Sequence, residues 1–393
     1  MTTILKGIRV LDLTHVISGP TATQILADLG AEVIKVEFPP NGDIFRDTPG
    51  LGPSCFLTLN RGKKSIMINL KERRGVELLL GLASVSDVFV ENLSPEASRK
   101  LGLRYQLFKK VNPRVVHCRI TSFGAGPYEK VPAWDPVLQA AAGIMSVTGH
   151  PPDDYVRAGI SLVDMTAAFH AVIGILAALI ERERSEKGAF IEASMFDAAL
   201  YYMGYWITYY DLFKKEPRPL GTTHIFASPY GLFDVGGEKV YIAVSGDEHW
   251  RRFCSGLELN DFLQKREYST NELRVKNKER LETALAGRLK ELSPAHVMRI
   301  LRRERIPHAP LNKVSGLPND PQVLSRGMVR LQHYSRGRLR YRTAVNPLKI
   351  GNVRPCARGS PPQAGEQTED VLRELLGLST TEISELKALG VVK

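Results

Sequence analysis

Short β-branched runs alternate with helical spacing of apolar positions over the first 120 residues of the chain. Strands are predicted at Ile8–Leu13, Glu32–Glu37, Lys64–Leu70, Asp87–Glu91 and Val115–Ile120. Helices are predicted between several of these strands, at Thr21–Leu29, Val76–Ala83 and Pro95–Leu101. Strands that alternate with helices indicate an α/β fold, in which helices cover both faces of a parallel sheet. In such sheets, ligands bind at the carboxyl ends of the strands.

The character of the chain then changes twice. The segment Trp134–Leu179 is rich in small apolar residues and is dominated by a long predicted helix that begins near Asp164. Tyr230–Val244 is typical of a β-hairpin that turns at Gly236-Gly237, and Glu248–Leu301 is largely helical. We therefore expect a large α/β domain (1–224), a smaller α+β domain (225–330), and a linker with two short helices that returns to the large domain (331–393).

The composition is that of an ordinary globular protein, with 393 residues, 43% of them hydrophobic and 24% charged. The cysteines lie far apart and show no metal-ligand spacing, which indicates a reducing cytoplasm and no metal site. The N-terminus lacks the basic and long apolar regions of a signal peptide. The apolar stretch Ala167–Ile180 is shorter than the roughly 20 residues that span a bilayer, so we expect a buried helix and no membrane partner.

The net charge of +11 is concentrated between Arg299 and Arg342, a segment that holds ten arginines and two acidic residues. Basic residues that bind nucleic acid are usually interleaved with stacking aromatics or carried on a recognition helix. Neither pattern is evident here, so nucleic acid is not expected as a partner. A solvated basic face is the preferred interpretation, and an anionic ligand or an acidic partner surface remains the alternative.

The first predicted strand–helix turn can be compared with the dinucleotide-binding fingerprint. The turn sequence THVISGPTATQ contains Gly19 alone, followed by Pro20, and therefore lacks the GxGxxG spacing. Without those glycines the backbone cannot easily approach a pyrophosphate, which argues against NAD as a cofactor.

Several motifs occur in a fixed order along nearly the whole chain. They are LKGIRVLDLTHVISGPTATQILADLGAEVIKVEFPPNGDIFR, LNRGKKSIMINLKERRG, DVFVENLSPEASRKLGL, ITSFGAGP, AWDPVLQAAAGIMSVTG, GISLVDMTAAFHAVIGILAALIERERSEKG and AGEQTEDVLRELLG. Together they resemble the family III CoA-transferases, a group that is related to the alpha-methylacyl-CoA racemases.

The resemblance implies a Rossmann-like large domain that binds the CoA nucleotide, a small domain that closes over the acyl site, and two chains interlocked as rings in a homodimer. A heteromer with a homologous subunit is the alternative to this homodimer. It also implies an acyl-CoA and a free carboxylic acid as substrates, with no tightly bound cofactor. The nucleophilic aspartate of the family falls on Asp164 in the motif GISLVDMTAA.

The chemistry suits an aspartate. A carboxylate with a pKa of about 3.9 is ionised at neutral pH and needs no general base, unlike a serine. Attack on an acyl thioester gives a mixed anhydride with Asp164 and releases CoA thiolate, so neither ATP nor a metal is required. From its position alone, however, an aspartate at a helix start can also be an ordinary N-cap.

Transfer and racemisation differ in their need for a second acid–base group. The histidine of the racemases falls on Trp134 in Ala133-Trp134-Asp135, and a tryptophan cannot exchange a proton in that role. His150 and His170 do not match the position, so transfer is favoured. An acyl-CoA racemase, an intramolecular CoA-transferase and a non-catalytic CoA-binding protein remain alternatives. For Asp135, a hydrogen bond near the acyl site and a turn-stabilising role are both open.

The resemblance also suggests positions that contact CoA. They are Ile17 and Ser18 in the first turn, Phe38, Ile68 and Lys71 near the adenine, Asn92, Leu93 and Ser94 beside the pantetheine, Arg46 and Lys100 as phosphate partners, and Trp134 and Asp135. Two positions depart from the family pattern, because Phe38 stands where relatives often have arginine and Pro132 where formyl-CoA transferase has lysine. Lys71 and Lys100 can also be solvated surface lysines.

The segment that corresponds to the glycine-rich flap of formyl-CoA transferase bears on which acyl groups the protein accepts. The glycine-rich flap of formyl-CoA transferase is replaced by Ser228–Phe233 (SPYGLF), which disfavours oxalate and formate as substrates. The overall likeness is closer to members that handle dicarboxylates such as succinate and glutarate. Arg157 or His224 is a candidate for binding the distal carboxylate of such a substrate.

Overall fold

The computed structural model describes residues 4–334, 338–357 and 359–393. Residues 335–337 of the basic segment therefore lie outside the described residues, as do the first three residues of the N-terminal segment. The chain divides into two compact units. The first comprises Met1–Ile144, Arg157–Lys215 and Pro321–Lys393, and the second comprises Met145–Val156 and Glu216–Asp320.

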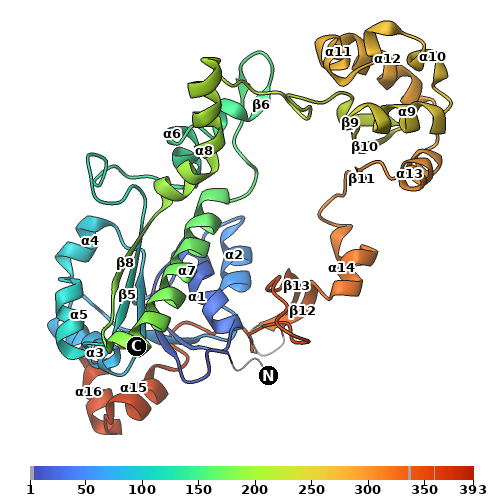
Figure 1. The fold of residues 1–393 in the computed structure, drawn as a ribbon. Helices are drawn as coiled ribbons and strands as arrows, with labels where there is room; N and C mark the ends of the chain where they lie inside the picture. The colour runs from blue at the N-terminus through green and yellow to red at the C-terminus, as the bar shows by residue number, and fades with distance from the viewer. Residues whose placement is uncertain (1–3, 335–337, 358) are drawn as a thin grey trace. The chain divides into compact units, whose positions relative to one another are not determined.

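A six-stranded parallel sheet forms the centre of the first unit (Figure 1). The strands are β1 (Arg9–Leu13), β2 (Glu32–Glu37), β3 (Lys64–Met67), β4 (Val88–Glu91), β5 (Val116–Thr121) and β8 (Phe190–Ser194). Their order, β3-β2-β1-β4-β5-β8, is that of a Rossmann sheet. Because the winding reverses between β1 and β4, a crevice is expected at the carboxyl ends of these two strands.

The predicted α/β fold with a large parallel sheet is confirmed, and the five predicted strands all form. The sixth strand, β8, was not predicted. It pairs with β5 alone and lies at the edge of the sheet, and its first three residues are partly or fully exposed. An edge strand of this kind lacks the continuous apolar run that marks a buried parallel strand.

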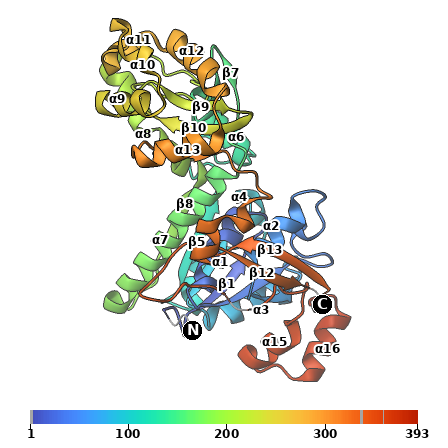
Figure 2. The same cartoon turned by 90° about the vertical axis from the view of Figure 1, so that its right-hand side faces the viewer.

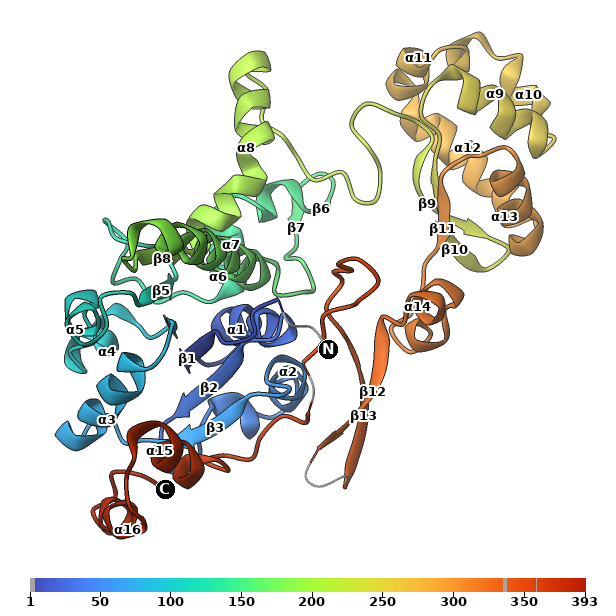
Figure 3. The same ribbon diagram turned by 60° about the horizontal axis from the view of Figure 1, so that its bottom comes forward.

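The two faces of the sheet are covered by different helices (Figure 3). Helices α1 (Ser18–Asp28) and α7 (Leu162–Ser185) pack together on one face. The opposite face carries α3 (Arg73–Ser84), α5 (Tyr105–Val111) and the C-terminal pair α15 (Thr368–Leu376) and α16 (Thr380–Ala388), whose apolar side chains share one core with Leu11, Ile34 and Phe89. The C-terminal helices thus pack in the first unit.

The face toward α1 carries buried charges beside apolar residues such as Val10, Val33 and Leu26. Asp12 and Lys35 alternate with the core residues of β1 and β2, so they point to the other side of the sheet. The Lys63 ammonium lies 3.0 Å from Asp12 Oδ2, and the Lys35 ammonium lies 3.0 Å from Asp43 Oδ2. Lys35 Nζ also donates to the Thr14 carbonyl (2.7 Å), which ties this network to the turn that follows β1.

The remaining elements complete both units. In the first unit they are η1 (Ile44–Arg46), α2 (Gly52–Leu59), α4 (Pro95–Lys100), α6 (Asp135–Ala141), α8 (Met195–Phe213), α14 (Pro321–Arg326), β12 (Val329–Tyr334) and β13 (Leu339–Ala344). In the second unit the short elements are η2 (Met145–Val147), β6 (Gly149–His150), β7 (Asp154–Tyr155), η3 (Arg266–Tyr268) and η4 (Leu317–Asn319).

The second unit is built on an antiparallel sheet of three strands, β11 (His308–Pro310), β10 (Glu238–Ala243) and β9 (Tyr230–Val235). The predicted hairpin turn at Gly236-Gly237 is confirmed, and both glycines have positive φ angles. Five helices pack around the sheet (Figure 2): α9 (Asp247–Gly256), α10 (Asn260–Leu263), α11 (Asn271–Lys276), α12 (Lys278–Lys290) and α13 (Pro294–Arg303).

The units divide the chain differently from the expected ranges 1–224, 225–330 and 331–393. Residues 216–224 belong to the second unit, because the Gly221 N–H donates to the Gly149 carbonyl (2.7 Å) and Thr222 bonds to β9 and β10. Residues 321–330 belong to the first unit, because β12 pairs with β13, and Tyr341 of β13 donates to the Leu57 carbonyl of α2 (2.9 Å).

Among the described residues, α7 alone is long and apolar enough to cross a bilayer, with a mean hydropathy of 2.0 over its most apolar 18-residue window. Half of that window is buried inside the protein. The prediction of a buried helix therefore holds for one face of α7 only. Phe169, Ile173 and Ile180 are exposed on its other face.

Replacing Asp12 by alanine should destabilise the protein strongly. The change leaves the buried Lys63 ammonium without its carboxylate partner, and breaking a buried ion pair in this way costs about 3–5 kcal/mol. Urea unfolding followed by far-UV circular dichroism measures the effect. Asp370→Ala is the control, because it breaks an exposed ion pair with Arg373 and should leave the unfolding midpoint nearly unchanged. Equal midpoints for the two variants would contradict the prediction.

Candidate functional site

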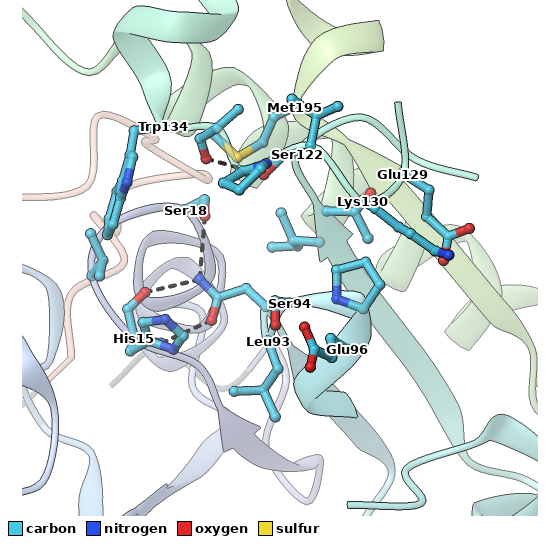
Figure 4. A pocket seen from close by; sticks show the side chains of 18 of the residues that line it. His15, Ser18, Leu93, Ser94, Glu96, Ser122, Glu129, Lys130, Trp134 and Met195 are labelled. Atoms are coloured by element: carbon cyan, nitrogen blue, oxygen red, sulfur yellow. Dashed lines mark hydrogen bonds between the residues drawn. The ribbon is translucent and has the colours of Figure 1, made fainter. Parts of the chain in front are cut away.

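A cavity of about 570 Å³ lies at the carboxyl edge of the large sheet, where the winding of the strands reverses (Figure 4). Its walls come from the segments that follow β1, β4 and β5, from the loop 129–134, and from the first turns of α6, α7 and α8. Its position agrees with the crevice expected for this sheet order. Figure 4 shows His15 and Ser18 on one wall, Leu93 and Ser94 beside them, and Ser122 and Met195 on another wall.

The turn between β1 and α1 is held in an unusual conformation. Val16 has a φ angle of 69°, which a β-branched residue rarely adopts. The Asn92 side chain stabilises the turn from the neighbouring strand, because its Oδ1 accepts from the His15 N–H (3.0 Å) and its Nδ2 donates to the His15 carbonyl (2.9 Å). The same amide group approaches Ser18 Oγ at 3.4 Å. Asn92 therefore fixes the wall of the cavity that Ser18 belongs to.

Asp164 projects into the cavity as the third residue of α7. Its side chain is nearly buried, and this burial, together with the negative charge of Asp135, raises the pKa of Asp164 to about 7. Hydrogen bonds from the hydroxyl and the backbone N–H of Ser18 oppose that shift. The expectation that this carboxyl keeps an ordinary pKa is therefore wrong, because desolvation disfavours its charged form.

Asp164 is not the cap of its own helix. Ser161 stands at the N-cap position of α7, and its side chain makes no capping bond. The carboxylate of Asp135 takes that role from another helix, since its Oδ2 accepts from the N–H groups of Val163 (2.7 Å) and Asp164 (3.1 Å). The N-cap interpretation of Asp164 is thereby excluded, and its side chain stays free to face the cavity.

Gln139 connects Asp135 to the segment that enters α7. Its Nε2 donates to Asp135 Oδ1 (2.5 Å), while its Oε1 accepts from the Ala158 N–H (2.8 Å). Gln139 is fully buried. One amide side chain thus joins α6 to both the capping carboxylate and the backbone just before the helix that carries Asp164.

The charges around the cavity are mixed. Arg99 and Glu129 form an ion pair of 3.1 Å, and Lys130 lines the same side of the cavity. Figure 4 shows Glu129 and Lys130 together at one end, well apart from Trp134. In the described part of the chain, no group of three His, Cys, Asp or Glu side chains is arranged to hold a metal ion.

Several of the predicted site residues come together in this cavity. They are Ser18, Asn92, Leu93, Ser94, Trp134, Asp135 and Asp164. Ile17 is the buried N-cap of α1 and lies beside the cavity without lining it. Trp134 is 59% exposed and directly precedes α6.

Other predicted contacts lie away from the cavity. Phe38 and Ile68 pack in the core on the α3 side of the sheet, and Lys71 is exposed. The Arg46 guanidinium makes two hydrogen bonds to Glu37 (2.5 and 2.8 Å) and stacks on Phe56. These four positions remain predictions as CoA contacts, and for Arg46 a phosphate would have to compete with Glu37.

The remaining candidates are also engaged elsewhere or lie in other parts of the chain. Lys100 is exposed and pairs with Glu96 one helical turn earlier (2.7 Å). Arg157 is exposed, and its Nη1 donates to the neighbouring Ala158 carbonyl (3.0 Å). His224 belongs to the second unit, where it contacts the rings of Phe226 and Tyr230. Their proposed roles stay predictions.

His15, Thr121, Ser122 and Met195 also line the cavity, and the sequence patterns did not predict them. Thr121 and Ser122 lie at the end of the predicted strand β5. Because ligands bind at the carboxyl ends of parallel strands, the sequence could have predicted these two residues. The ion pair of Arg99 and Glu129 could not be predicted in this way, because it joins residues that are 30 positions apart in the sequence.

Comparison with known proteins identifies the family. The family model of CoA-transferase family III matches residues 5–368. The chain is 33% identical over 400 residues to succinyl-CoA:glutarate CoA-transferase from Homo sapiens, covering 99% of this chain and 90% of that protein. It is also 33% identical to acetyl-CoA:oxalate CoA-transferase from Acetobacter aceti, covering 94% of this chain and 95% of that protein. Among solved structures, a CAIB/BAIF family protein from Brucella suis matches with a TM-score of 0.86 and 30% identity, covering 95% of this chain and all of that one. The chain belongs to CoA-transferase family III, and the resemblance seen in its motifs is confirmed.

Proposed function

We propose that this CoA-transferase moves CoA from an acyl-CoA to a free carboxylic acid, with Asp164 as the nucleophile. The observation that carries the proposal is the placement of one nearly buried carboxylate in a cavity at the switch point of the sheet. A carboxylate whose pKa lies near 7 is a stronger nucleophile than an ordinary aspartate and is still partly ionised at neutral pH.

The reaction proceeds through acyl groups carried on Asp164. The carboxylate attacks the thioester carbonyl carbon, a C–O bond forms, and the C–S bond breaks to release CoA thiolate. The thiolate then attacks the Asp164 carbonyl, which frees the donor acid and leaves a thioester on the enzyme. The acceptor carboxylate displaces the thiolate as a new anhydride, and the thiolate attacks the acceptor carbonyl to give the new acyl-CoA and regenerate Asp164. Each bond that forms replaces one that breaks.

The substrates we propose are dicarboxylyl-CoA esters, such as succinyl-CoA, with a dicarboxylic acid as acceptor. The support is the likeness to succinyl-CoA:glutarate CoA-transferase along 99% of the chain, together with the segment Ser228–Phe233 in place of a glycine-rich flap. Lys130 lies at one end of the cavity (Figure 4), where a cationic side chain favours an anionic ligand, and Arg99 lines the same cavity in its ion pair with Glu129.

The active form we propose is a homodimer. Helix α8 exposes a row of large apolar and aromatic side chains: Tyr201, Tyr202, Tyr205, Ile207, Tyr210, Leu212 and Phe213. Its C-terminal half stands clear of the sheet in the first unit (Figures 1 and 3). Phe169, Ile173 and Ile180 add further apolar surface on α7, which packs against α8. Exposed apolar side chains in this number favour a protein interface, and a second copy of the chain supplies a matching surface by symmetry.

Substitution of Asp164 tests the function directly. We expect wild-type protein to form new acyl-CoA esters when succinyl-CoA is incubated with a panel of carboxylic acids, and Asp164→Ala and Asp164→Asn to lose the exchange by at least about a thousandfold. Mass spectrometry of the CoA esters is the measurement. Substantial exchange by either variant would refute the assignment of the nucleophile. Deuterium uptake at the α-carbon without an acceptor acid would instead indicate racemisation.

The same pair of variants has an internal control for folding. Because the folded protein holds the pKa of Asp164 above its ordinary value, the ionised carboxylate destabilises the fold, and stability should fall as pH rises between roughly 4 and 7. Asp164→Asn removes this effect and should melt at or above the wild-type Tm at pH 8. A lower Tm would mean that lost activity reflects lost structure.

The rate should depend on pH through the same carboxyl group. We expect kcat/KM to rise with pH along a single acid limb whose midpoint lies near the pKa of Asp164, about 7, because only the carboxylate form attacks. Initial rates between roughly pH 5 and pH 9 in buffers of constant ionic strength measure this limb. A profile that is flat from pH 5 upward would show that the nucleophile has an ordinary pKa.

The exposed face of α8 should control assembly. We expect the double variant Tyr201→Glu, Tyr205→Glu to shift the protein from dimer to monomer, since it places two charges in an apolar surface. Sedimentation velocity measures the shift. Leu389→Glu is the matched control, because it charges an exposed apolar residue at the end of α16. A wild-type protein that sediments as a monomer would contradict the proposed dimer.

A further inference from the structure

We propose that Asp135 is a positioning residue for Asp164, whose carboxylate occupies the hydrogen-bond donors at the start of α7 and so keeps the nucleophile both fixed and reactive. This inference rests on the proposed function and deepens it. It assigns Asp135 to the preparation of the nucleophile, in place of a direct contact with CoA.

The geometry leaves the Asp135 carboxylate little capacity for a ligand. Its Oδ2 accepts from the N–H groups of Val163 (2.7 Å) and Asp164 (3.1 Å), and its Oδ1 accepts from Gln139 Nε2 (2.5 Å). The residue is only 5% exposed, although it lines the cavity. The bond to the Asp164 N–H acts on the backbone of the nucleophile itself, so Asp135 restricts where that residue can move.

The electrostatic consequence follows from the position of Asp164. The free N–H groups and the dipole of a helix start amount to roughly half a positive charge, which stabilises a nearby carboxylate and lowers its basicity. Asp164 stands in the first turn of the 24-residue helix α7 and would be subject to this effect. Asp135 brings a full negative charge to the same N–H groups and offsets it. The like charge is also one of the causes that raise the pKa of Asp164.

A variant of Gln139 distinguishes the positioning effect of Asp135 from the effect of its charge. Gln139 clamps Asp135 and also accepts from the Ala158 N–H (2.8 Å), in the segment that leads into α7. Gln139 is neutral and fully buried. Its removal therefore loosens the arrangement while the charge of Asp135 stays.

The other groups that face Asp164 come from two further helices. Ser18 of α1 donates its hydroxyl and its backbone N–H to the carboxylate, which favours the charged form. Burial, and after it the charge of Asp164, raises the pKa of the Cys55 thiol of α2. Within the described residues, no cation is a cause of the shift in the pKa of Asp164, and Asp135 is the charged group that contributes to it.

The pH profile of the exchange separates this role from a merely structural one. In Asp135→Asn the side-chain oxygen can still accept a hydrogen bond but the charge is gone, so we expect the acid limb of kcat/KM to move to lower pH by about one unit or more. In Gln139→Ala the charge remains, so the limb should stay in place while kcat falls by roughly tenfold to a hundredfold. KM for the acyl-CoA should change little in both.

The matched control is Asp197→Asn, which removes an exposed carboxylate from the same third position of helix α8. It should leave both the limb and kcat at the wild-type values. An acid limb in Asp135→Asn that coincides with that of the wild type would overturn the proposal. If that variant does not fold, Gln139→Ala decides, and a wild-type kcat in it would overturn the proposal. Exchange that survives in Asp164→Ala would instead refute the proposed function, so the two failures can be told apart.

Discussion

The amino end of α7 is closed by a carboxylate from α6, and the candidate site depends on this contact. Asp135 satisfies the N–H groups of Val163 and Asp164 that a helix start leaves unpaired. Because the cap is supplied from outside the helix, the aspartate at the third position does not have to serve as one. Its carboxylate can then face a cavity as a buried, weakly stabilised anion. Burying the Asp164 carboxylate beside Asp135 costs the folded chain some stability, and the same burial raises the pKa of Asp164.

Both faces of the large sheet combine apolar core residues with buried charged groups. The face toward α3, α5 and α15 packs an apolar core, in which Glu91 and His117 are also buried. The face toward α1 carries Asp12, Lys35 and Lys63, whose network reaches the turn after β1 through Thr14. That turn holds the strained Val16 and presents Ser18 to Asp164. The buried charges therefore support the wall of the cavity, where an apolar core could not offer hydrogen bonds to a strained backbone.

Much of this architecture can be predicted from the sequence. Five strands of the sheet, the C-terminal helix pair and the start of α7 follow from apolar periodicity, and motif likeness places Asn92 to Ser94 and Asp164 at the site. The edge strand β8 could not be predicted because it is only half buried. The ion pair of Lys100 with Glu96 could have been predicted, since it joins residues four apart on one helix.

The parts that escaped prediction depend on contacts between distant segments. The role of Asp135 as an external cap requires α6 to lie against the start of α7, and nothing in its local sequence reveals this. The pairing of Arg46 with Glu37 likewise depends on how the segment after β2 folds back. The raised pKa of Asp164 depends on burial and on a neighbouring charge, so the ordinary value was the only one that the sequence could supply.

The most direct test of the central claim follows an oxygen atom into Asp164. If acyl groups are carried on this carboxylate, an acceptor acid labelled with heavy oxygen leaves one labelled oxygen on Asp164 when the new acyl-CoA departs. Limited turnover with the labelled acid and succinyl-CoA, followed by proteolysis and mass spectrometry, should find the added mass in the peptide that contains Asp164. Formation of the new acyl-CoA with no label in that peptide would contradict the account.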